Sequence, residues 1–242
     1  MSNPYVDAVA ADLPIHWWRM EETSGSTVED SAGNLDGTVV GASLDHPSAT
    51  DNLGSAVSFD GVDDYIETNY TPNDTDLSNG ASVELWVYQD TNVGSGDQFA
   101  FGSWGAPRFY IGDAQANGYQ VGFGDAFAND AAFSRDGWHY LAFTNDGQLT
   151  RVYRDAVEVY TFSSSWSGSN SNTAHIGRVN GDGREFGGTI DEVAIYDYAL
   201  SPSRIQAHYD AAFATEDPAN LQATVDGDTV SLSWDASPLV PA

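Results

Sequence analysis

The feature that most constrains the fold is a long series of short apolar runs, separated by glycine, asparagine, aspartate and serine. Six Asp-Gly pairs, beginning at residues 36, 60, 136, 146, 182 and 226, mark tight turns, since glycine adopts positive φ without steric cost. This density of short strands predicts an all-β fold of two antiparallel sheets. We expect strands at 37–41, 56–59, 64–68, 82–89, 98–103, 107–112, 118–124, 138–144, 149–154, 157–162, 173–177 and 187–196.

Two short helices are expected to flank the strands. Asn3 can cap a helix that begins at Pro4, because its side chain accepts hydrogen bonds from the free amides of a first turn. Ser201 can do the same for a helix that begins at Pro202. The apolar stripes expected to face the sandwich are Val6, Val9, Ala10 and Leu13 in the first helix, and Ile205, Tyr209 and Ala212 in the second.

The strand at 82–89 has two unlike faces. Side chains alternate along a strand, so Val83, Leu85 and Val87 share one aliphatic face, which we expect to lie in the core. The opposite face is mixed and carries Glu84, Trp86 and Tyr88.

The composition is strongly acidic. The 242 residues include 36 Asp and Glu against 8 basic residues, all of them Arg, and the formal charge is -28. Such a charge repels nucleic acid and anionic membranes, and its self-repulsion destabilises the compact state unless salt screens it. At molar salt the screening length is ~3 Å, so the acidic, lysine-free composition indicates a protein of a halophile. The alternative is an ordinary acidic secreted protein.

The sequence carries no recognisable targeting signal. Residues 1–7 have neither a basic start nor an apolar stretch of a secretory signal, and no run approaches the ~18 apolar residues of a membrane span. Cysteine is absent, which excludes disulfides and thiol chemistry. We therefore expect a protein that is assembled in the cytoplasm and released without an export signal. The alternative is that Met1 replaces a signal that was removed.

Five short segments together resemble one family. They are Trp17 to Gly25, Phe59 to Tyr65, Val83 to Val87, Gly137 to Ala142, and Gly188 to Tyr196 with Ala199-Leu200-Ser201 after it. Their order resembles the laminin-G-like, concanavalin A-like jelly-roll family. The resemblance implies an antiparallel two-sheet jelly-roll sandwich over residues 1–215. One departure is Ala156, which occupies a hairpin position where this family usually has Gly, so we expect a different turn type there.

Residues 216–242 differ in composition from the rest. Glu216-Asp217-Pro218 indicates a linker, and residues 221–235 are similar to the first hairpin of a fibronectin type III domain. A whole module of that type needs roughly 90–100 residues, so this segment is only part of one. Either the segment is cut short or another subunit completes its sheet.

Catalytic motifs are not found. The five histidines show no close metal-ligand spacing, and neither a nucleophile elbow nor a phosphate-binding loop occurs. His139, between Trp138 and Tyr140, is expected to be structural. Glycosidases of this architecture would carry Glu-x-Asp-x-Glu on one strand, whereas Asp191 and Glu192 are adjacent and should face opposite sides. The sequence therefore predicts a protein that is not an enzyme.

The resemblance also implies a structural calcium site. In this family a calcium ion often lies where an early Asp-x-x-Gly-Asn loop meets the late Ile-Asp-Glu strand, which nominates Asp30, Asn34 and Asp191 as ligands, with carbonyls near Gly33 and Gly37. The alternative is a turn in which these side chains bond the backbone. A second acidic loop is interpreted as a turn rather than a site, and it contains Asp60, Asp63 and Asp64.

Loop aromatics are the candidates for ligand contacts. Trp104 and Trp166 are flanked by glycine and serine, which would leave each ring accessible to a sugar, and Phe127 is a third loop aromatic. The alternative is that both tryptophans plug an end of the sandwich.

These observations predict a non-enzymatic virion structural protein of a virus of a halophilic host, located on the capsid or tail surface. Its partners would be host-surface glycans or glycoproteins and other virion subunits, without nucleic acid or membrane insertion, and the sequence is compatible with a homo-oligomer. The start of the chain, from Tyr5 to Trp18, is similar to the starts of such domains in phage tail and capsid-associated proteins. One alternative is a purely architectural decoration protein. Another is the carbohydrate-binding accessory module of an extracellular protein or enzyme.

Overall fold

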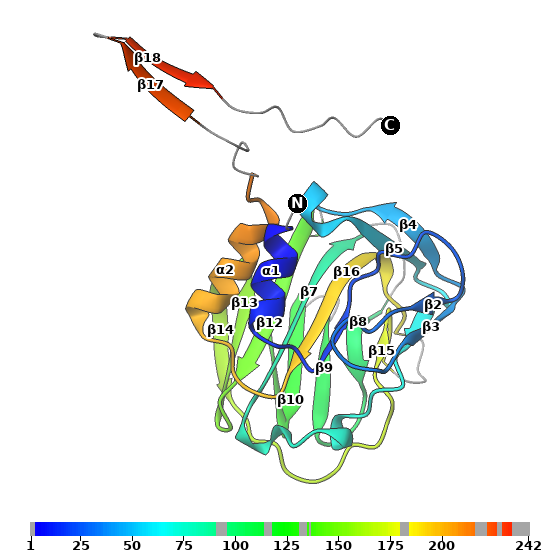
Figure 1. Cartoon of the computed structure of the whole chain (residues 1–242). Helices are drawn as coiled ribbons and strands as arrows, with labels where there is room; N and C mark the ends of the chain where they lie inside the picture. Colours follow the sequence, from blue (N-terminus) through cyan, green and yellow to red (C-terminus); the bar gives the residue numbers. More distant parts are fainter. Residues whose placement is uncertain are drawn as a thin grey trace.

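The computed structural model describes residues 3–90, 96–113, 118–130, 135, 137–179, 184–215, 222–226 and 229–233. For Asp130 and for the last two segments it describes the backbone alone. Residues 3–215 contain an antiparallel sandwich of two eight-stranded sheets, as the sequence predicts (Figure 1).

Sheet A has the order β14-β13-β12-β7-β16-β5-β4, and β1 also pairs with β16. Its strands are β1 (His16–Trp18), β4 (Ser43–Pro47), β5 (Ser55–Asp60), β7 (Ala81–Gln89), β12 (Trp138–Asn145), β13 (Leu149–Arg154), β14 (Val157–Ser163) and β16 (Gly187–Tyr196). β7 and β16 pair at the centre of the sheet, although 97 residues separate the end of one from the start of the other.

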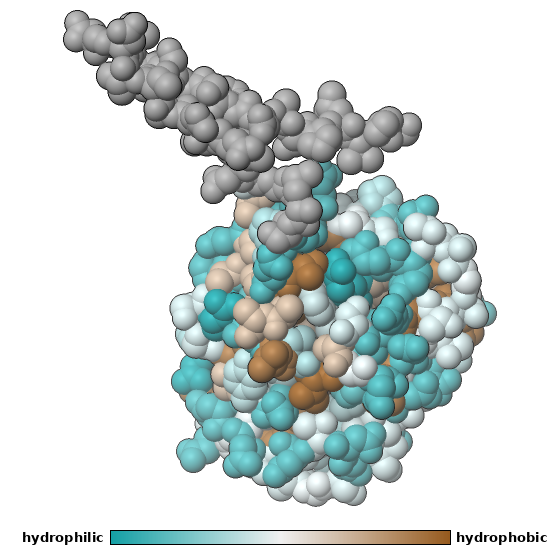
Figure 2. Space-filling model, in the orientation of Figure 1, coloured by the Kyte–Doolittle hydropathy of each residue, from teal (hydrophilic) through white to brown (hydrophobic). Residues whose placement is uncertain are grey.

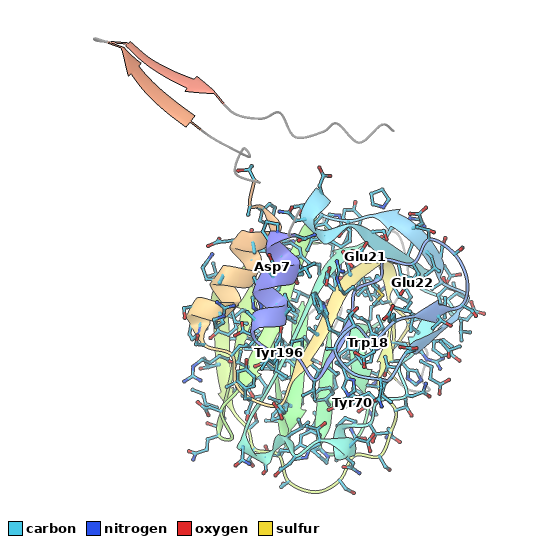
Figure 3. The ribbon with its side chains drawn as sticks, in the orientation of Figure 1. Asp7, Trp18, Glu21, Glu22, Tyr70 and Tyr196 are labelled. Carbon is cyan, nitrogen blue, oxygen red and sulfur yellow. The ribbon has the colours of Figure 1, made fainter. Side chains whose placement is uncertain are left out.

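Sheet B has the order β11-β10-β9-β8-β15-β6-β3-β2. Its strands are β2 (Thr27–Val28), β3 (Gly37–Val40), β6 (Tyr65–Glu67), β8 (Gln98–Ser103), β9 (Arg108–Asp113), β10 (Tyr119–Gly124), β11 (Ala126–Asp130) and β15 (His175–Ile176). The hydrophobic core lies between the two sheets. Val83, Leu85 and Val87 of β7 are part of it, which confirms the predicted core face, and Trp18 and Tyr70, labelled in Figure 3, belong to the same core.

Two helices cover the outer face of sheet A. They are α1 (Pro4–Ala11), capped by Asn3, and α2 (Pro202–Ala212), capped by Ser201, both as predicted. Figure 1 shows them side by side in front of the sheet, and they pack on a second apolar cluster that includes Trp17, Trp86 and Tyr140. The short 3-10 helices are η1 (Asp51–Leu53), η2 (Pro72–Asp74) and η3 (Leu77–Asn79). Figure 2 shows that the surface over this side is mostly hydrophilic, with scattered apolar residues.

The mixed face of β7 is therefore buried at Glu84 and Trp86, which the alternation pattern does not predict, whereas Tyr88 is 40% exposed. Glu84 and Trp86 are almost inaccessible to solvent beneath α2. His208 of α2 donates through Nδ1 to both oxygens of Glu84, at 3.1 and 2.9 Å, and through Nε2 to Asp12 at 2.8 Å. Burial alone would lower the pKa of His208, but the two carboxylates raise it overall. Glu84 also accepts from the hydroxyls of two tyrosines, Tyr140 and Tyr196.

Several sequence predictions are corrected by the structure. Leu13 is 77% exposed instead of facing the sandwich, because α1 ends at Ala11, and Ala10, predicted on the same stripe, is exposed as well. Both Asp155 and Ala156 have positive φ, as in a type I′ hairpin turn, so the turn keeps its type despite the missing glycine. The strands β1, β2, β4 and β11 were not predicted.

The predicted placement of Asp191 and Glu192 on opposite faces is also wrong. The register of β16 against β7 shifts between Asp191 and Ala194, and Glu192 has a φ of 53°, which marks a β-bulge. Ile190 and Val193, on either side of the two acids, both point into the core. The extra residue therefore turns both carboxylates to the helix-covered side.

β17 (Gln222–Asp226) and β18 (Thr229–Ser233) form the hairpin expected in the C-terminal segment. In the described part of the chain these two strands pair only with each other. The fibronectin type III resemblance and the boundary at residue 216 stay predictions, and Trp234 lies outside the described residues. Among the described residues, no helix is long and apolar enough to cross a membrane.

Candidate functional site

Sheet B differs from sheet A in that no described helix covers its outer face. Alternation along β9 and β10 sends Phe109, Ile111 and Val121 into the core and leaves Tyr110 and Gln120 on the outer face. Tyr110 and Gln120 are nevertheless almost inaccessible to solvent, so other parts of the chain cover this face of β9 and β10.

A polar hollow of about 330 Å³ opens at the end of the sandwich where β10 turns into β11. This polar hollow is lined by Asp125, Gln148, Ser163, Ser164 and Ser165. It joins residues that are up to 40 positions apart in the sequence, since the hairpin of β13 and β14 brings Gln148 beside the serines.

Hydrogen bonds fix the walls of the polar hollow. The Ser165 amide donates to Asp125 Oδ1 at 3.1 Å, and the Ser164 amide donates to the Gln148 carbonyl at 2.9 Å. Arg108 of β9 donates to the Asp125 carbonyl at 3.0 Å. The side chains of Asp125, Gln148 and Ser165 are exposed, so they present a carboxylate, an amide and a hydroxyl to solvent.

Two aromatic residues, Trp166 and Phe127, lie close in the chain to the walls of the polar hollow. Trp166 follows the serines and packs its ring against Phe109 and Phe123 at 6.3 and 5.4 Å, so it closes the end of the sandwich and remains partly exposed. Phe127 is 50% exposed on β11, and the guanidinium of Arg108 lies 5.1 Å from its ring centre. Trp166, a predicted ligand residue, thus directly follows a residue of the polar hollow. Its ring contacts are those of the alternative, a side chain that closes the end of the sandwich.

Trp104, the other predicted ligand residue, lies elsewhere on the outer face of sheet B. Its ring stacks on Tyr110 at 5.4 Å and meets Phe99 edge-on at 5.9 Å. The guanidinium of Arg184 lies 4.0 Å from the centre of the Trp104 ring. Trp104 is therefore part of an aromatic stack and not an isolated platform.

The two acids nominated for calcium, Asp30 and Asp191, have separate hydrogen-bond partners. Asp30 Oδ1 accepts from the amides of Trp17, Ala32 and Gly33, and Oδ2 accepts from His16 Nδ1 at 2.6 Å and from the Leu35 amide. A carboxylate offers about four lone-pair positions, so five protein donors saturate Asp30. These hydrogen bonds hold the pKa of Asp30 well below its usual range, although burial opposes them. The geometry of Asp30 is that of the alternative, a turn with side-chain-to-backbone hydrogen bonds, and it does not fit a calcium ligand.

Asn34 and Asp191 lie in contrasting environments. Asn34 is exposed in its loop, whereas Asp191 is fully buried and accepts a short hydrogen bond from the Ser48 hydroxyl. Glu192 beside it accepts from the Trp17 indole at 2.6 Å. Burial, and for Asp191 the neighbouring carboxylate of Glu192, raise the pKa of both acids.

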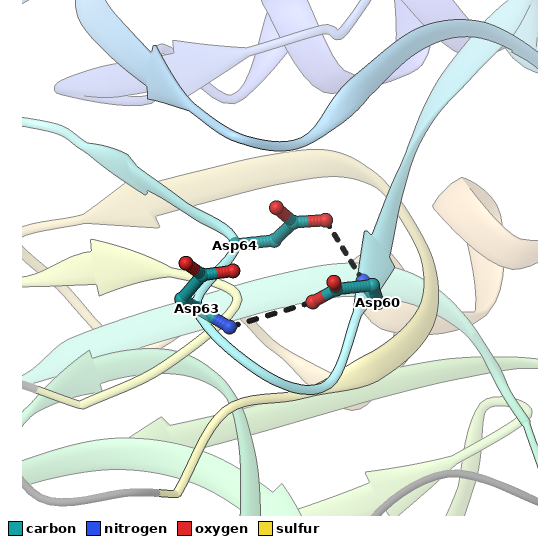
Figure 4. A group of neighbouring side chains, drawn as sticks. All are labelled: Asp60, Asp63 and Asp64. Carbon is teal, nitrogen blue, oxygen red and sulfur yellow. Dashed lines mark hydrogen bonds between the residues drawn. The ribbon is translucent and has the colours of Figure 1, made fainter.

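One acidic loop has ligand atoms close enough to hold a cation. The carboxylates of Asp60, Asp63 and Asp64 lie within 4.8 Å of one another, the only such group of three among the described Asp, Glu and His residues (Figure 4). Asp60 Oδ1 accepts from the Val62 amide at 2.8 Å, and Asp64 Oδ2 accepts from the Asp60 amide at 2.9 Å. These bonds are those of the turn that the sequence predicts.

Sequence reasoning missed the polar part of the site. Asp125 and Gln148 carry no motif, and they meet the serines only through the pairing of β13 with β14 and the turn after β10. The available signal was the run Ser163-Ser164-Ser165 directly before Trp166, which places hydroxyls next to an aromatic ring.

A family model described as the concanavalin A-like lectin/glucanases superfamily matches residues 60–206. The chain belongs to this family. A search of curated proteins finds no match. Among solved structures, this concanavalin A-like domain is similar to domain 4 of an extracellular arabinanase of Geobacillus stearothermophilus, solved with arabinotriose. The identity is 23%, the TM-score 0.59, and the match covers 82% of this chain and 98% of that one.

Two other structures share the fold at lower identity. The ligand-binding domain of botulinum neurotoxin serotype D, solved with N-acetylneuraminic acid, matches with 12% identity and a TM-score of 0.65, over 94% of this chain and 63% of that one. The sialidase of Trypanosoma rangeli in complex with sialic acid matches with 14% identity and a TM-score of 0.61. The match covers 81% of this concanavalin A-like domain but only 32% of the sialidase chain. At these identities the likeness establishes a shared lectin-like jelly-roll fold.

Proposed function

We propose that this chain is a non-catalytic glycan-binding domain and that the polar hollow beside Trp166 is its binding site. The observation that carries the proposal is the combination of a depression of about 330 Å³, with a carboxylate, an amide and hydroxyls on its walls, and two partly exposed aromatic residues close to those walls in the chain. Ligand sites begin at about this volume.

The chemistry of the polar hollow suits a sugar. A sugar hydroxyl both donates and accepts hydrogen bonds, and the walls offer an acceptor in Asp125 and groups of both kinds in Gln148 and the serines. The apolar faces of sugar rings pack on aromatic side chains, and Trp166 and Phe127 are partly exposed beside the polar groups. The wall is held by backbone hydrogen bonds, so binding requires little ordering of the protein.

Similar structures support the class of ligand. The arabinanase domain was solved with arabinotriose and the neurotoxin domain with N-acetylneuraminic acid, so this fold carries saccharides in two proteins of different activity. The non-catalytic part of the proposal rests on the sequence, in which no strand carries the Glu-x-Asp-x-Glu pattern of glycosidases of this architecture.

A glycan array in about 2 M KCl tests this proposal, because molar salt screens the -28 charge. We expect the wild type to bind a defined set of glycans and Asp125→Asn to weaken that binding by about 10-fold or more, as expected when a charged hydrogen-bond acceptor is lost. Asp210→Asn, an exposed acid on α2, is the matched control and should bind like the wild type. A wild type with no hits, or an Asp125→Asn variant that binds equally well, would contradict the proposal.

We further propose that the domain acts on the surface of a virion of a halophilic host, where glycan binding would serve attachment. This setting is supported by the acidic, lysine-free composition and by the resemblance of the first residues to phage tail and capsid-associated domains. Mass spectrometry of purified particles tests the setting, and failure to find the chain would contradict it. A chain that is present on particles but binds no glycan in molar salt would favour the architectural alternative.

A further inference from the structure

Two arginines on the outer face of sheet B form no ion pair within the part of the chain that the structure describes. Acids outnumber arginines 36 to 8, and four arginines form ion pairs with acids in the described part of the chain. These are Arg19 with Glu21, Arg135 with Asp113, Arg151 with Asp146, and Arg204 with Asp12. Arg178 and Arg184 form no ion pair with any described carboxylate.

Both guanidinium groups instead lie over aromatic rings. Arg178 is 3.3 Å from the centre of the Tyr65 ring, and Arg184 is 4.0 Å from the centre of Trp104 and 5.9 Å from that of Phe99. Ring faces attract a cation but accept no strong hydrogen bond, so the N–H groups at the edges of both guanidiniums keep their donor capacity.

Part of that donor capacity is buried without an acceptor. Arg178 Nε and Arg184 Nη1 are inaccessible to solvent and have no hydrogen-bond partner among the described residues. His175 Nδ1 on β15 is also buried without a hydrogen-bond partner among the described residues, and the His175 ring meets the Tyr65 ring edge-on. Burial and the neighbouring charge of Arg178 lower the pKa of His175 to about 4. Native proteins leave few buried polar groups unpaired, because each costs free energy, so such a group calls for an explanation.

Backbone hydrogen bonds hold the chain next to each arginine. The Phe186 amide donates to the Gly177 carbonyl at 2.7 Å, and the Phe99 amide donates to the Arg184 carbonyl at 3.2 Å. Described acids near these contacts are Glu67, opposite His175 in the sheet register, and Asp97, whose charge raises the pKa of Tyr110. Ring contacts and backbone hydrogen bonds together therefore set the positions of the two arginines.

We infer that Arg178 and Arg184 form a binding subsite for the carboxylate groups of an acidic saccharide. The planar guanidinium forms two parallel hydrogen bonds with a carboxylate. Tyr65 and Trp104 are partly exposed beside the two arginines and can pack against the sugar, whereas Phe99, Tyr110 and His175 are buried. Arg108 connects this face to the polar hollow through its hydrogen bond to the Asp125 carbonyl, so the inference rests on the proposed function and adds the chemical class of the glycan.

The test uses oligogalacturonate as the acidic probe and the same oligomer with every carboxylate methyl-esterified as the neutral probe. Titrations are run on the full chain in about 2 M KCl, where long-range charge effects are screened and direct contacts remain. We expect the wild type to bind the acidic probe at least about 10-fold more tightly than the ester, and Arg178→Gln with Arg184→Gln to remove that difference. Arg151→Gln, an arginine of sheet A paired with Asp146, is the matched control and should preserve it.

Affinity for the neutral probe separates ligand binding from a structural role. Each guanidinium–ring contact stabilises the fold, so the double variant should melt at a lower temperature but keep the wild-type affinity for the neutral probe. Loss of affinity for both probes would indicate a structural role instead. Arg184→Lys keeps the charge but loses the paired donors, so it should restore only part of the preference for the acidic probe.

The possible failures are distinguishable. If neither probe nor any glycan of the array binds, the proposed function fails and this inference fails with it. If saccharides bind through the polar hollow but esterification and the double arginine variant change nothing, this inference alone is overturned. A preference for sulfated oligosaccharides over oligogalacturonate would overturn the assignment of a carboxylate.

Discussion

Removal of the His208 imidazole should cost a large share of the stability of the domain. In His208→Ala, the fully buried Glu84 keeps only the hydroxyls of Tyr140 and Tyr196 and loses the donor that contacts both of its oxygens. Breaking a buried charge pair by removing one partner costs about 3–5 kcal/mol. Total stabilities are about 5–15 kcal/mol, and a domain of this size loses roughly 2–4 °C per kcal/mol, so we expect the melting temperature to fall by roughly 6–20 °C.

The assay is thermal and denaturant unfolding in about 2 M KCl, with His46→Ala as the control. His46 is a partly exposed residue of the edge strand β4, and its removal should change the free energy of unfolding by no more than about 0.5 kcal/mol. Glu84→Gln combined with His208→Ala should cost less than the sum of the single changes, because the unpaired charge is then absent. A loss below about 1 kcal/mol for His208→Ala would refute the reasoning.

The pH dependence gives an independent check on the same pair. The pKa of His208 is raised above 6.5, so its contribution is complete below pH 6.5 and is lost as the pH rises through the folded value. The pKa of Glu84 is lowered below 4.5 despite its burial, chiefly by His208, so its contribution is present above pH 4.5 and is lost as the pH falls through the folded value. The stability difference between wild type and His208→Ala should therefore be greatest between these limits, and a difference that grows above pH 8 would contradict it.

Three further substitutions test separate features. Asp30→Asn should lower the free energy of unfolding by about 1–3 kcal/mol, equally with and without a calcium chelator at fixed ionic strength, and a loss seen only with calcium would restore Asp30 as a ligand. Ala156→Gly should raise the stability by up to about 1 kcal/mol because it relieves a positive φ, whereas Ala207→Gly within α2 should lower it by about as much. Gly122→Ala would place a Cβ 2.4 Å from the Tyr110 ring, so titration with oligogalacturonate should show weaker binding, and unchanged affinity would count against a role of this ring stack.

The elements that the sequence predicts well are those determined by local chemistry. Asn3 and Ser201 cap their helices as expected, and β8, β13 and β16 have the predicted bounds, because apolar runs and turn residues mark them within a few positions. β2 has only two residues, too few to show a period. The predicted core face of β7 follows from alternation alone.

Features that depend on distant partners were not predicted. The bulge at Glu192 arises from pairing with β7, about 100 residues earlier, and it reverses the expected direction of one carboxylate. The sequence shows Glu84 only as a charged residue within a strand. Its burial is compensated by His208 of α2, which is 124 residues away in the sequence. The polar hollow is similarly formed by three separate turns, none of which has a distinctive sequence.

The two ends of the sandwich domain lie close together. Asn52 of η1 bonds both ends of the sandwich domain, since its carbonyl accepts from the Asn3 amide group at 2.8 Å and its own amide group donates to the Ala214 carbonyl at 2.7 Å. Any scaffold that continues from residue 215 is therefore joined beside the two helices that cover sheet A, whereas the rings and arginines belong to sheet B. Copies mounted on one scaffold would repeat the same binding face, so weak individual contacts with a repeating surface polymer would add up to avidity.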